Sequence, residues 1–186
     1  MNASFPPLRA VLDANVLYPF TLRDTLLRTA AAGYYQLYWS PQILEETTRN
    51  LVNSAGITVQ QAEHLLAAMH RAFPDAMVTG YEALIESMPN QANDRHVAAA
   101  ALTVSAQVIV TSNLRDFRVL PEGIEAQSPD RFLIDLFAID PDGMVTVIEE
   151  QATALKRPPV TFDELLHGLA KSAPAFVNTL RAHLAR

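Results

Sequence analysis

Four acidic side chains occupy recurring places in this sequence, each just after an apolar segment or near the start of a helical one. They are Asp13, Glu46, Asp94 and Asp116. Carboxylates held close together repel one another and raise each other's pKa, so a folded protein keeps such a cluster mainly to hold a cation. Oxygen ligands without thiolate or imidazole favour hard ions, Mg²⁺ or Mn²⁺, over zinc. The acids therefore predict a metal site, provided that the fold brings them together.

Each acid also has an ordinary structural explanation. Asp13 and Asn15 suit the cap of a helix that begins near Val16, and Asp94 suits the cap of another helix. Asp116 fits a turn, and the two adjacent glutamates of the second segment could simply face solvent. Because the same placement recurs four times, we favour one shared site over four separate explanations.

The segments that must position these acids alternate between strand-like and helical patterns. Residues 8–12 form a short apolar run that is typical of a buried strand and ends at Asp13. Residues 35–39 are aromatic and strand-like, and QVIVT at 107–111 is the clearest central strand. This alternation predicts an α/β fold, a parallel sheet of about four or five strands flanked by helices. In such a sheet, ligand crevices lie at the carboxyl ends of the strands, where Asp13 and Asp116 are expected.

Caps and helix breakers mark the predicted helices. Ser40 and Pro41 supply an N-cap and a proline in the first turn, and Gly33 stands where a C-cap glycine belongs. Thr58 is expected to cap another helix, and Asn93 or Asp94 a third. Helices are predicted over residues 22–32, 42–51, 59–72 and 95–106. Short strands are predicted over 77–81 and 124–126, with a short helix through Ile85.

At Ser128 the alternation of strand-like and helical segments gives way to helical segments alone. We predict one domain over residues 1–127 and an α-helical appendage over 128–186, broken at Pro158-Pro159 and at Pro174. Apolar residues recur at helical spacing in this appendage. They would pack on the domain, on a second copy of the chain or on a partner, and the sequence leaves these three possibilities open.

Composition excludes several classes of function. The chain of 186 residues is 49% hydrophobic and 18% charged, as expected of a folded protein, and it lacks cysteine, which excludes disulfides, thiolate metal sites and cysteine nucleophiles. A net charge of −6 argues against a protein that coats nucleic acid non-specifically. No Walker A or GxGxxG pattern occurs, so we expect no nucleotide cofactor. With neither a secretory signal nor a bilayer-spanning run, a cytoplasmic protein is expected.

The histidines give little signal. His64 and His70 are six positions apart and so face different sides of a helix, which excludes an i,i+4 metal pair. We expect His96 to pack or to point outward.

Taken in order, four motifs make the chain similar to a known family. They are VLDANVLY (11–18), SPQILEETTRNL (40–51), NDRHVAAAAL (93–102) and VIVTSNLRDF (108–117). With this order and spacing, residues 8–127 resemble the PIN domain family, specifically the VapC-type toxin ribonucleases of type II toxin–antitoxin pairs. The terminal helices look like the extra C-terminal region carried by one branch of that family.

The resemblance implies a metal-dependent endoribonuclease with a set of named site residues. Its catalytic acids would be Asp13, Glu46, Asp94 and Asp116, with Glu46 favoured over Glu45 by its position after the Ile-Leu pair. Asp13, Asp94 and Asp116 would bind Mg²⁺ or Mn²⁺, and Glu46 would ligate through water or orient the nucleophile. Polar residues that would order these acids or bind phosphate are Asn15, Thr111, Ser112 and Asn113.

Partners are implied as well. RNA phosphates would contact Arg95, Arg115 and Arg118, although these arginines could equally be exposed counter-charges for the acids. The resemblance also implies a small VapB-like antitoxin protein and a homodimer. Because no apolar run is long enough to span a bilayer, we expect no membrane association.

Two alternatives stay open. One is a PIN-fold scaffold that binds RNA or protein without cleaving it. The other is a haloacid-dehalogenase-like phosphatase, because DANV resembles the start of that group's motif. The second acid of that motif is Asn15 here, and neither Lys156 nor Lys171 is placed to supply the lysine that the phosphatase needs.

Overall fold

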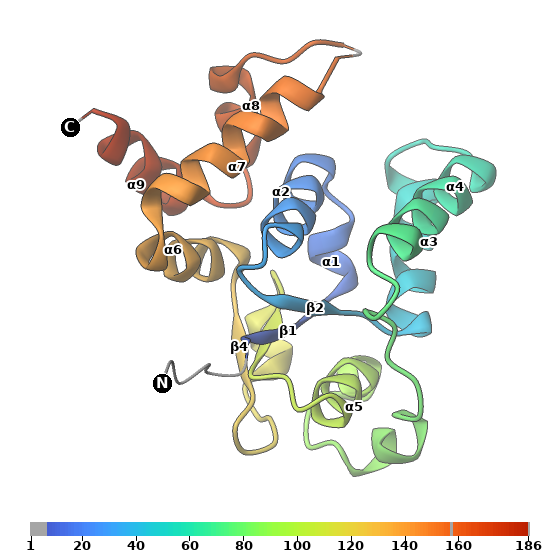
Figure 1. Cartoon of the computed structure of the whole chain (residues 1–186). Helices are drawn as coiled ribbons and strands as arrows, with labels where there is room; N and C mark the ends of the chain where they lie inside the picture. Colours follow the sequence, from blue (N-terminus) through green and yellow to red (C-terminus); the bar gives the residue numbers. More distant parts are fainter. Residues whose placement is uncertain (1–6, 157, 186) are drawn as a thin grey trace.

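A four-stranded parallel sheet lies at the centre of the described part of the chain. The computed structural model describes residues 7–156 and 158–185 (Figure 1). The strands are β1 (Arg9–Leu12), β2 (Gln36–Tyr38), β3 (Val108–Val110) and β4 (Glu125–Gln127), in the order β2-β1-β3-β4. This arrangement confirms the predicted α/β fold with a parallel sheet.

The register of the two central strands fixes the frame of the site. Val11 of β1 pairs with Ile109 of β3, and both side chains are fully buried. Parallel strands covered on both faces read as continuous β-branched and aliphatic runs, which is the pattern of both segments. Their C-terminal ends therefore lie side by side at one rim of the sheet.

Helices cover both faces of the sheet. Figure 1 shows α1 and α2 above the sheet and α5 below it. The helices before the last strand are α1 (Ala14–Leu17), α2 (Phe20–Ala31), α3 (Pro41–Ser54), α4 (Val59–Ala72) and α5 (Arg95–Thr103), with three 3₁₀ helices, η1 (Glu82–Ser87), η2 (Ala92–Asp94) and η3 (Leu114–Phe117).

Local capping determines several of these boundaries. The Ser40 hydroxyl accepts a hydrogen bond of 3.2 Å from the Ile43 amide at the start of α3. Thr58 and Gln61 form a reciprocal capping box on α4. Gly33 follows α2 with φ of +87°, the left-handed conformation in which glycine is least strained. These caps agree with the sequence signals.

Two local predictions were wrong. No strand forms over residues 77–81, where a single bridge joins Met77 to Trp39. Gly80 has φ of +78°, so the backbone turns away instead of extending a ladder. Helix α5 ends at Thr103 rather than at residue 106, because Ser105 takes a left-handed conformation with φ of 52°.

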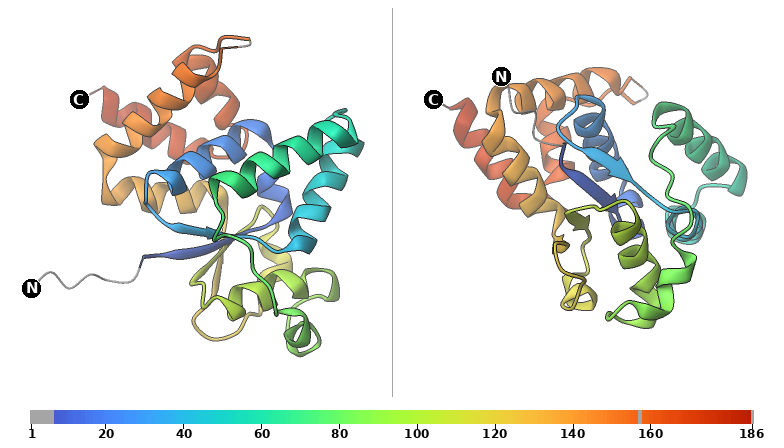
Figure 2. Two further views of the ribbon diagram at one scale, coloured as in Figure 1. Left: turned by 45° about the vertical axis from the view of Figure 1, so that its right-hand side comes forward. Right: turned by 60° about the horizontal axis from the view of Figure 1, so that its bottom comes forward.

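Four C-terminal helices form a group that packs on the chain's own α2 through two of its members. They are α6 (Pro129–Ile139), α7 (Pro141–Ala154), α8 (Phe162–Leu169) and α9 (Pro174–Leu184). Both α7 and α8 contact α2, and Figure 2 shows this group of helices beside α2. Thr25 of α2 donates a hydrogen bond of 2.8 Å to Gln151 of α7, and both side chains are fully buried. Of the three packing partners that the sequence allowed, the structure shows the domain itself.

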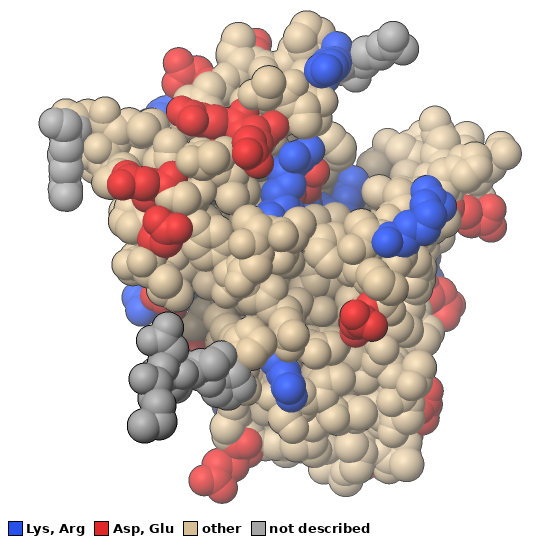
Figure 3. All heavy atoms as spheres, in the orientation of Figure 1, with Lys and Arg blue, Asp and Glu red and all other residues tan. Residues whose placement is uncertain are grey.

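Charge is unevenly spread over the face shown in Figure 3. Acidic side chains gather at the upper left, where α6 and α7 lie in Figure 1. Lysine and arginine side chains on this face are separated from one another and form no broad basic surface. Within residues 7–156 and 158–185, no helix combines the length and the apolarity that crossing a membrane requires.

Candidate active site

Asp13 lies at the rim where the two central strands end. It directly follows β1, and its amide donates a hydrogen bond of 3.1 Å to the carbonyl of Val110 in β3. Only 5% of the residue is exposed. A carboxylate buried to this degree needs hydrogen-bond donors to offset its lost hydration.

Three donors meet the Asp13 carboxylate. The amide of Ala14 lies 2.7 Å from Oδ1, and Oδ2 accepts from Asn15 Nδ2 at 2.6 Å and from Thr111 Oγ1 at 2.7 Å. Burial nevertheless raises the pKa of Asp13, with a further increase from the Glu46 carboxylate, against the lowering effects of Thr111 and Ala14. Asp13 thus caps α1, as its ordinary explanation holds, but the cap uses one of its two oxygens.

Asn15 and Thr111 connect the start of α1 to the end of β3. Asn15 Nδ2 donates to Thr111 Oγ1 at 3.0 Å, and Asn15 Oδ1 accepts from the Ser112 amide at 2.9 Å. The Asn113 amide donates to Thr111 Oγ1 at 3.1 Å. Asn15 and Thr111 therefore act on Asp13 through their side chains, whereas Ser112 enters this network through its backbone.

Glu46 and Glu45 have different surroundings on α3. The Glu45 side chain is 72% exposed and pairs with Arg49 at 3.2 Å. The Glu46 side chain is 29% exposed, and its Oε1 lies 3.1 Å from Nε2 of His96. Because α1 packs on α3, Glu46 faces the region of Asp13.

His96 is the residue that sequence reasoning missed. It packs inward on α5 with a side chain that is 2% exposed, and its contact with Glu46 was not foreseen. The available signal was a polar side chain in a helix whose next residues, 97–101, are valine and alanine and are all fully buried. A histidine on such an apolar helix implies a specific partner.

The charges of the other three acids all act on Asp94. It precedes α5 as its cap residue, yet its side chain makes no capping hydrogen bond. Burial raises its pKa most, Asp13 and Asp116 raise it further, and Glu46 adds a smaller increase, while His96 opposes them. Such effects require nearby charges, so the four acids share one neighbourhood. Capping alone does not explain Asp94.

Asp116 is held by its own turn. It lies in η3, and the Asn113 side-chain amide donates to its Oδ2. The Asp116 amide in turn donates to the Asn113 carbonyl at 3.3 Å. Asn113 therefore connects Asp116 to Thr111, and through Thr111 to Asp13.

The three arginines near the acids differ in their contacts. Arg95 donates from Nε to the Asn90 carbonyl at 3.1 Å and pairs with Glu86 at 3.6 Å, which commits it to the preceding loop. Arg115 and Arg118 are exposed and form no ion pair with any described carboxylate. Among the described residues, neither side chain therefore forms a salt bridge with one of the four acids, and both are open to solvent.

The donor set fits a hard divalent cation in its chemistry. None of the four acids pairs with a lysine or arginine in the described part of the chain. Their mutual repulsion is therefore not offset by such a side chain. Across the described ranges, however, no three Asp, Glu or His side chains lie close enough together to form a ready-made metal site. An ion would therefore have to draw the carboxylates closer together.

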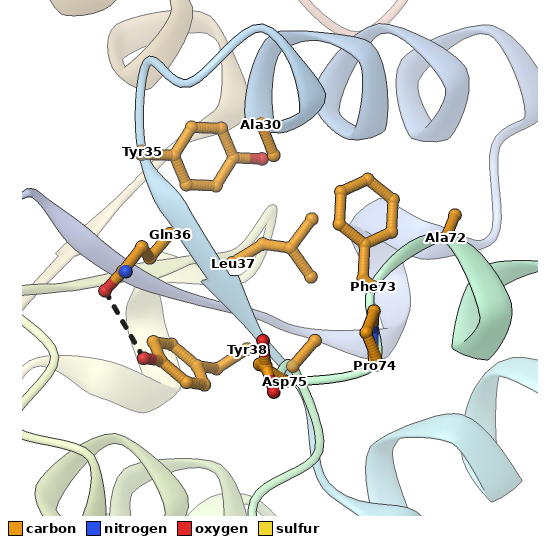
Figure 4. Close-up of a pocket in the computed structure, with 10 residues that line it drawn as sticks. Ala30, Tyr35, Gln36, Leu37, Tyr38, Ala72, Phe73, Pro74 and Asp75 are labelled. Carbon is orange, nitrogen blue, oxygen red and sulfur yellow. Dashed lines mark hydrogen bonds between the residues drawn. The ribbon is translucent and has the colours of Figure 1, made fainter.

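A separate pocket lies beside β2, at an edge of the sheet. It has a volume of about 240 Å³ and is lined by β2, the end of α4 and the turn that follows it (Figure 4). None of the four acids lines this pocket. We therefore assign the candidate site by its side-chain chemistry rather than by its depth.

Comparison with known proteins gives consistent matches for both parts of the chain. A family model described as a PIN domain matches residues 9–115, and another, described as the VapC50 C-terminal domain, matches residues 129–182. A Mycobacterium tuberculosis protein named "Putative ribonuclease VapC50" is 38% identical over 109 residues. That match covers 57% of this chain and 64% of the relative, which is less than two thirds of the relative's length.

Proposed function

Because the chain belongs to the PIN domain family, we propose that it is a metal-dependent endoribonuclease, the toxin of a toxin–antitoxin pair. One observation carries the proposal: Asp13, Asp116 and Glu46 lie on separate elements, yet all three add to the rise that burial causes in the pKa of Asp94. A cluster of four carboxylates that pairs with no described lysine or arginine is best explained by a cation that binds there.

Each acid has a distinct role in this proposal. Asp13, Asp94 and Asp116 would hold Mg²⁺ or Mn²⁺, which supplies Lewis acidity at the phosphate and lowers the pKa of bound water. The hydrogen bonds to Asp13 and Asp116 fix these carboxylates in advance. Glu46, which keeps an accessible carboxylate, would orient the attacking water.

The substrate would be held by groups near the rim. Arg115 and Arg118 would bind RNA phosphates, which position the strand without reading its sequence. The exposed Ser112 and Asn113 side chains would bind the phosphate next to the cleaved bond. Arg95 contributes less, because the loop that precedes η2 already occupies it.

The partners belong to the same proposal. We infer a small VapB-like antitoxin that inhibits the enzyme, a homodimer and a cytoplasmic location, all of which rest on the family resemblance. The acidic side chains over α6 and α7 are suited to a basic protein segment. We also propose that the catalytic domain ends at residue 127 and that the helices from residue 128 form a separate appendage.

The alternative is a PIN-fold scaffold that binds without cleaving. The observation that favours it is the spacing of the carboxylates, which do not converge on one point among the described residues. The two functions differ in whether RNA is hydrolysed, so one assay separates them.

The test is cleavage of a mixed RNA pool by purified protein, freed of any antitoxin that copurifies with it. We expect cleavage with Mg²⁺ or Mn²⁺, loss of cleavage with EDTA, and loss in Asp94→Asn. Glu45→Gln is the matched control, because Glu45 faces solvent and, among the described residues, pairs with Arg49 alone. No cleavage with either metal would support the scaffold, and cleavage that survives in Asp94→Asn would contradict the assigned site.

A further inference from the structure

A buried imidazole lies behind the acidic cluster. The His96 side chain is 2% exposed, and neither ring nitrogen makes an aligned hydrogen bond with a described residue. The contact that reaches it is with Glu46, whose Oε1 lies 3.1 Å from His96 Nε2.

Packing alone does not account for this histidine. The five positions that follow it on α5 are occupied by valine and alanine and are fully buried. A buried polar group without a partner costs about 1–3 kcal/mol, so an apolar side chain would be the more stable choice if the position served only the core. The Glu46 contact gives the imidazole a role that an apolar residue could not fill.

The contact also joins the two helices that carry acids of the site. Glu46 lies on α3, and Asp94 directly precedes α5, which carries His96. Glu46 Oε2 receives no hydrogen bond from a described residue and so stays available to water. A hydrogen bond from this imidazole to Oε1 would therefore determine the direction in which Oε2 points.

We propose, resting on the proposed function, that His96 is a positioning residue: its Nε2–H donates to Glu46 Oε1 and fixes the carboxylate that orients the attacking water. The electrostatic effects agree, because His96 opposes the rise in pKa at both Asp13 and Asp94 and so lies near both. Groups that orient active-site ligands in this way typically change activity or metal affinity by about 10- to 100-fold when they are removed.

Two variants separate positioning from packing. His96→Gln keeps an N–H donor near the place of Nε2, whereas His96→Leu fills a similar volume without any donor. We expect His96→Leu to lower kcat for RNA cleavage about 10- to 100-fold with little change in KM, and His96→Gln to recover most of the loss. In a Glu46→Gln background, His96→Leu should cause little further loss, because the two residues act as one unit.

A second readout does not depend on activity. In metal-free protein, the imidazole ¹⁵N shifts of His96 should change in Glu46→Gln and stay unchanged in the control Glu45→Gln. A wild-type kcat in His96→Leu, or additive losses in the double variant, would overturn the proposal, as would unchanged ¹⁵N shifts in Glu46→Gln. If the wild type cleaves no RNA, the proposed function fails, and the NMR comparison then decides whether His96 holds Glu46.

Discussion

Thr111 donates a hydrogen bond of 2.7 Å to Asp13, although the two residues are 98 positions apart in the chain. The bond follows from the pairing of β1 with β3, because Asp13 and Thr111 are the residues that directly follow the paired Leu12 and Val110. Sheet register thus places a donor against the most deeply buried acid of the site.

Replacing Thr111 with valine should destabilise the protein. The change keeps the shape of the side chain but removes the donor to Asp13 and the acceptor that Asn15 and the Asn113 amide use. We expect a loss of about 1–3 kcal/mol in the free energy of unfolding, measured with urea. Thr111→Ser keeps the hydroxyl and should lose much less. Equal stability of the valine variant and the wild type would show that this bond is not a structural requirement.

Asp94→Asn should raise the melting temperature of the metal-free protein at neutral pH. Burial and the neighbouring acids raise the pKa of Asp94 above its ordinary value of 3.8, so the folded state favours the neutral side chain. Asparagine is neutral at every pH and forfeits no cap, because Asp94 makes no capping bond. We expect a gain of a few degrees.

The pH dependence of that gain provides its check. Between 3.8 and the raised pKa, the folded protein binds more protons at Asp94 than the unfolded chain does, so stability falls as the pH rises. The advantage of Asp94→Asn should therefore be complete above the raised pKa and vanish below about pH 3.8. A lower melting temperature for the variant at neutral pH would argue against charge repulsion at this site.

Local signals predicted much of the fold. The caps at Ser40 and Thr58 and the glycine after α2 depend on neighbouring residues, and so the sequence reveals them. The end of α5 and the missing strand near Met77 depend on left-handed backbone at Ser105 and Gly80, which apolar periodicity does not report.

The site was less predictable because its contacts are non-local. The sequence indicated which acids follow strands or begin helices. It did not indicate that the Asp94 side chain would make no capping hydrogen bond at the start of α5. The contact between Glu46 and His96 arises only when α3 and α5 are placed against the sheet. The choice of α2 as the surface for the C-terminal helices is likewise set by distant side chains, among them Thr25 and Gln151.

Gly143→Ala should weaken the docking of the C-terminal helices. A Cβ at this position of α7 would collide with the Asp140 carboxylate and the Tyr34 hydroxyl, which are themselves joined by a hydrogen bond of 2.9 Å. To relieve the collision, Asp140 would have to move away from the Gly143 amide, which it caps at 3.0 Å, and the loss of such a cap costs about 0.5–2 kcal/mol, measurable by thermal unfolding. Gly168→Ala in α8 is the control, because its Cβ would lie 3.3 Å from Thr21 Oγ1 and helical alanine is otherwise favourable. The account of this contact fails if both variants melt together.

Arg115→Ala and Arg118→Ala should weaken RNA binding without changing stability. Both side chains are exposed and free of ion pairs with described carboxylates, so we expect a higher KM and a salt dependence of log Kd reduced by about one phosphate contact for each change. Arg95→Ala should instead lower the melting temperature, because Arg95 holds Asn90 and Glu86. If Arg95→Ala alone raised KM, the assignment of the RNA contacts would have to be reversed.

Direct measurement of Mn²⁺ binding tests the central claim, that acids from separate elements form one cation site. Titration of the purified protein, followed by calorimetry or by the EPR signal of free Mn²⁺, should show binding to the wild type and to the control Glu45→Gln. Asp94→Asn should bind at least about tenfold more weakly, since loss of even an outer-shell group typically has that effect. Wild-type protein that binds no Mn²⁺, or Asp94→Asn that binds it as tightly as wild type, would contradict the claim.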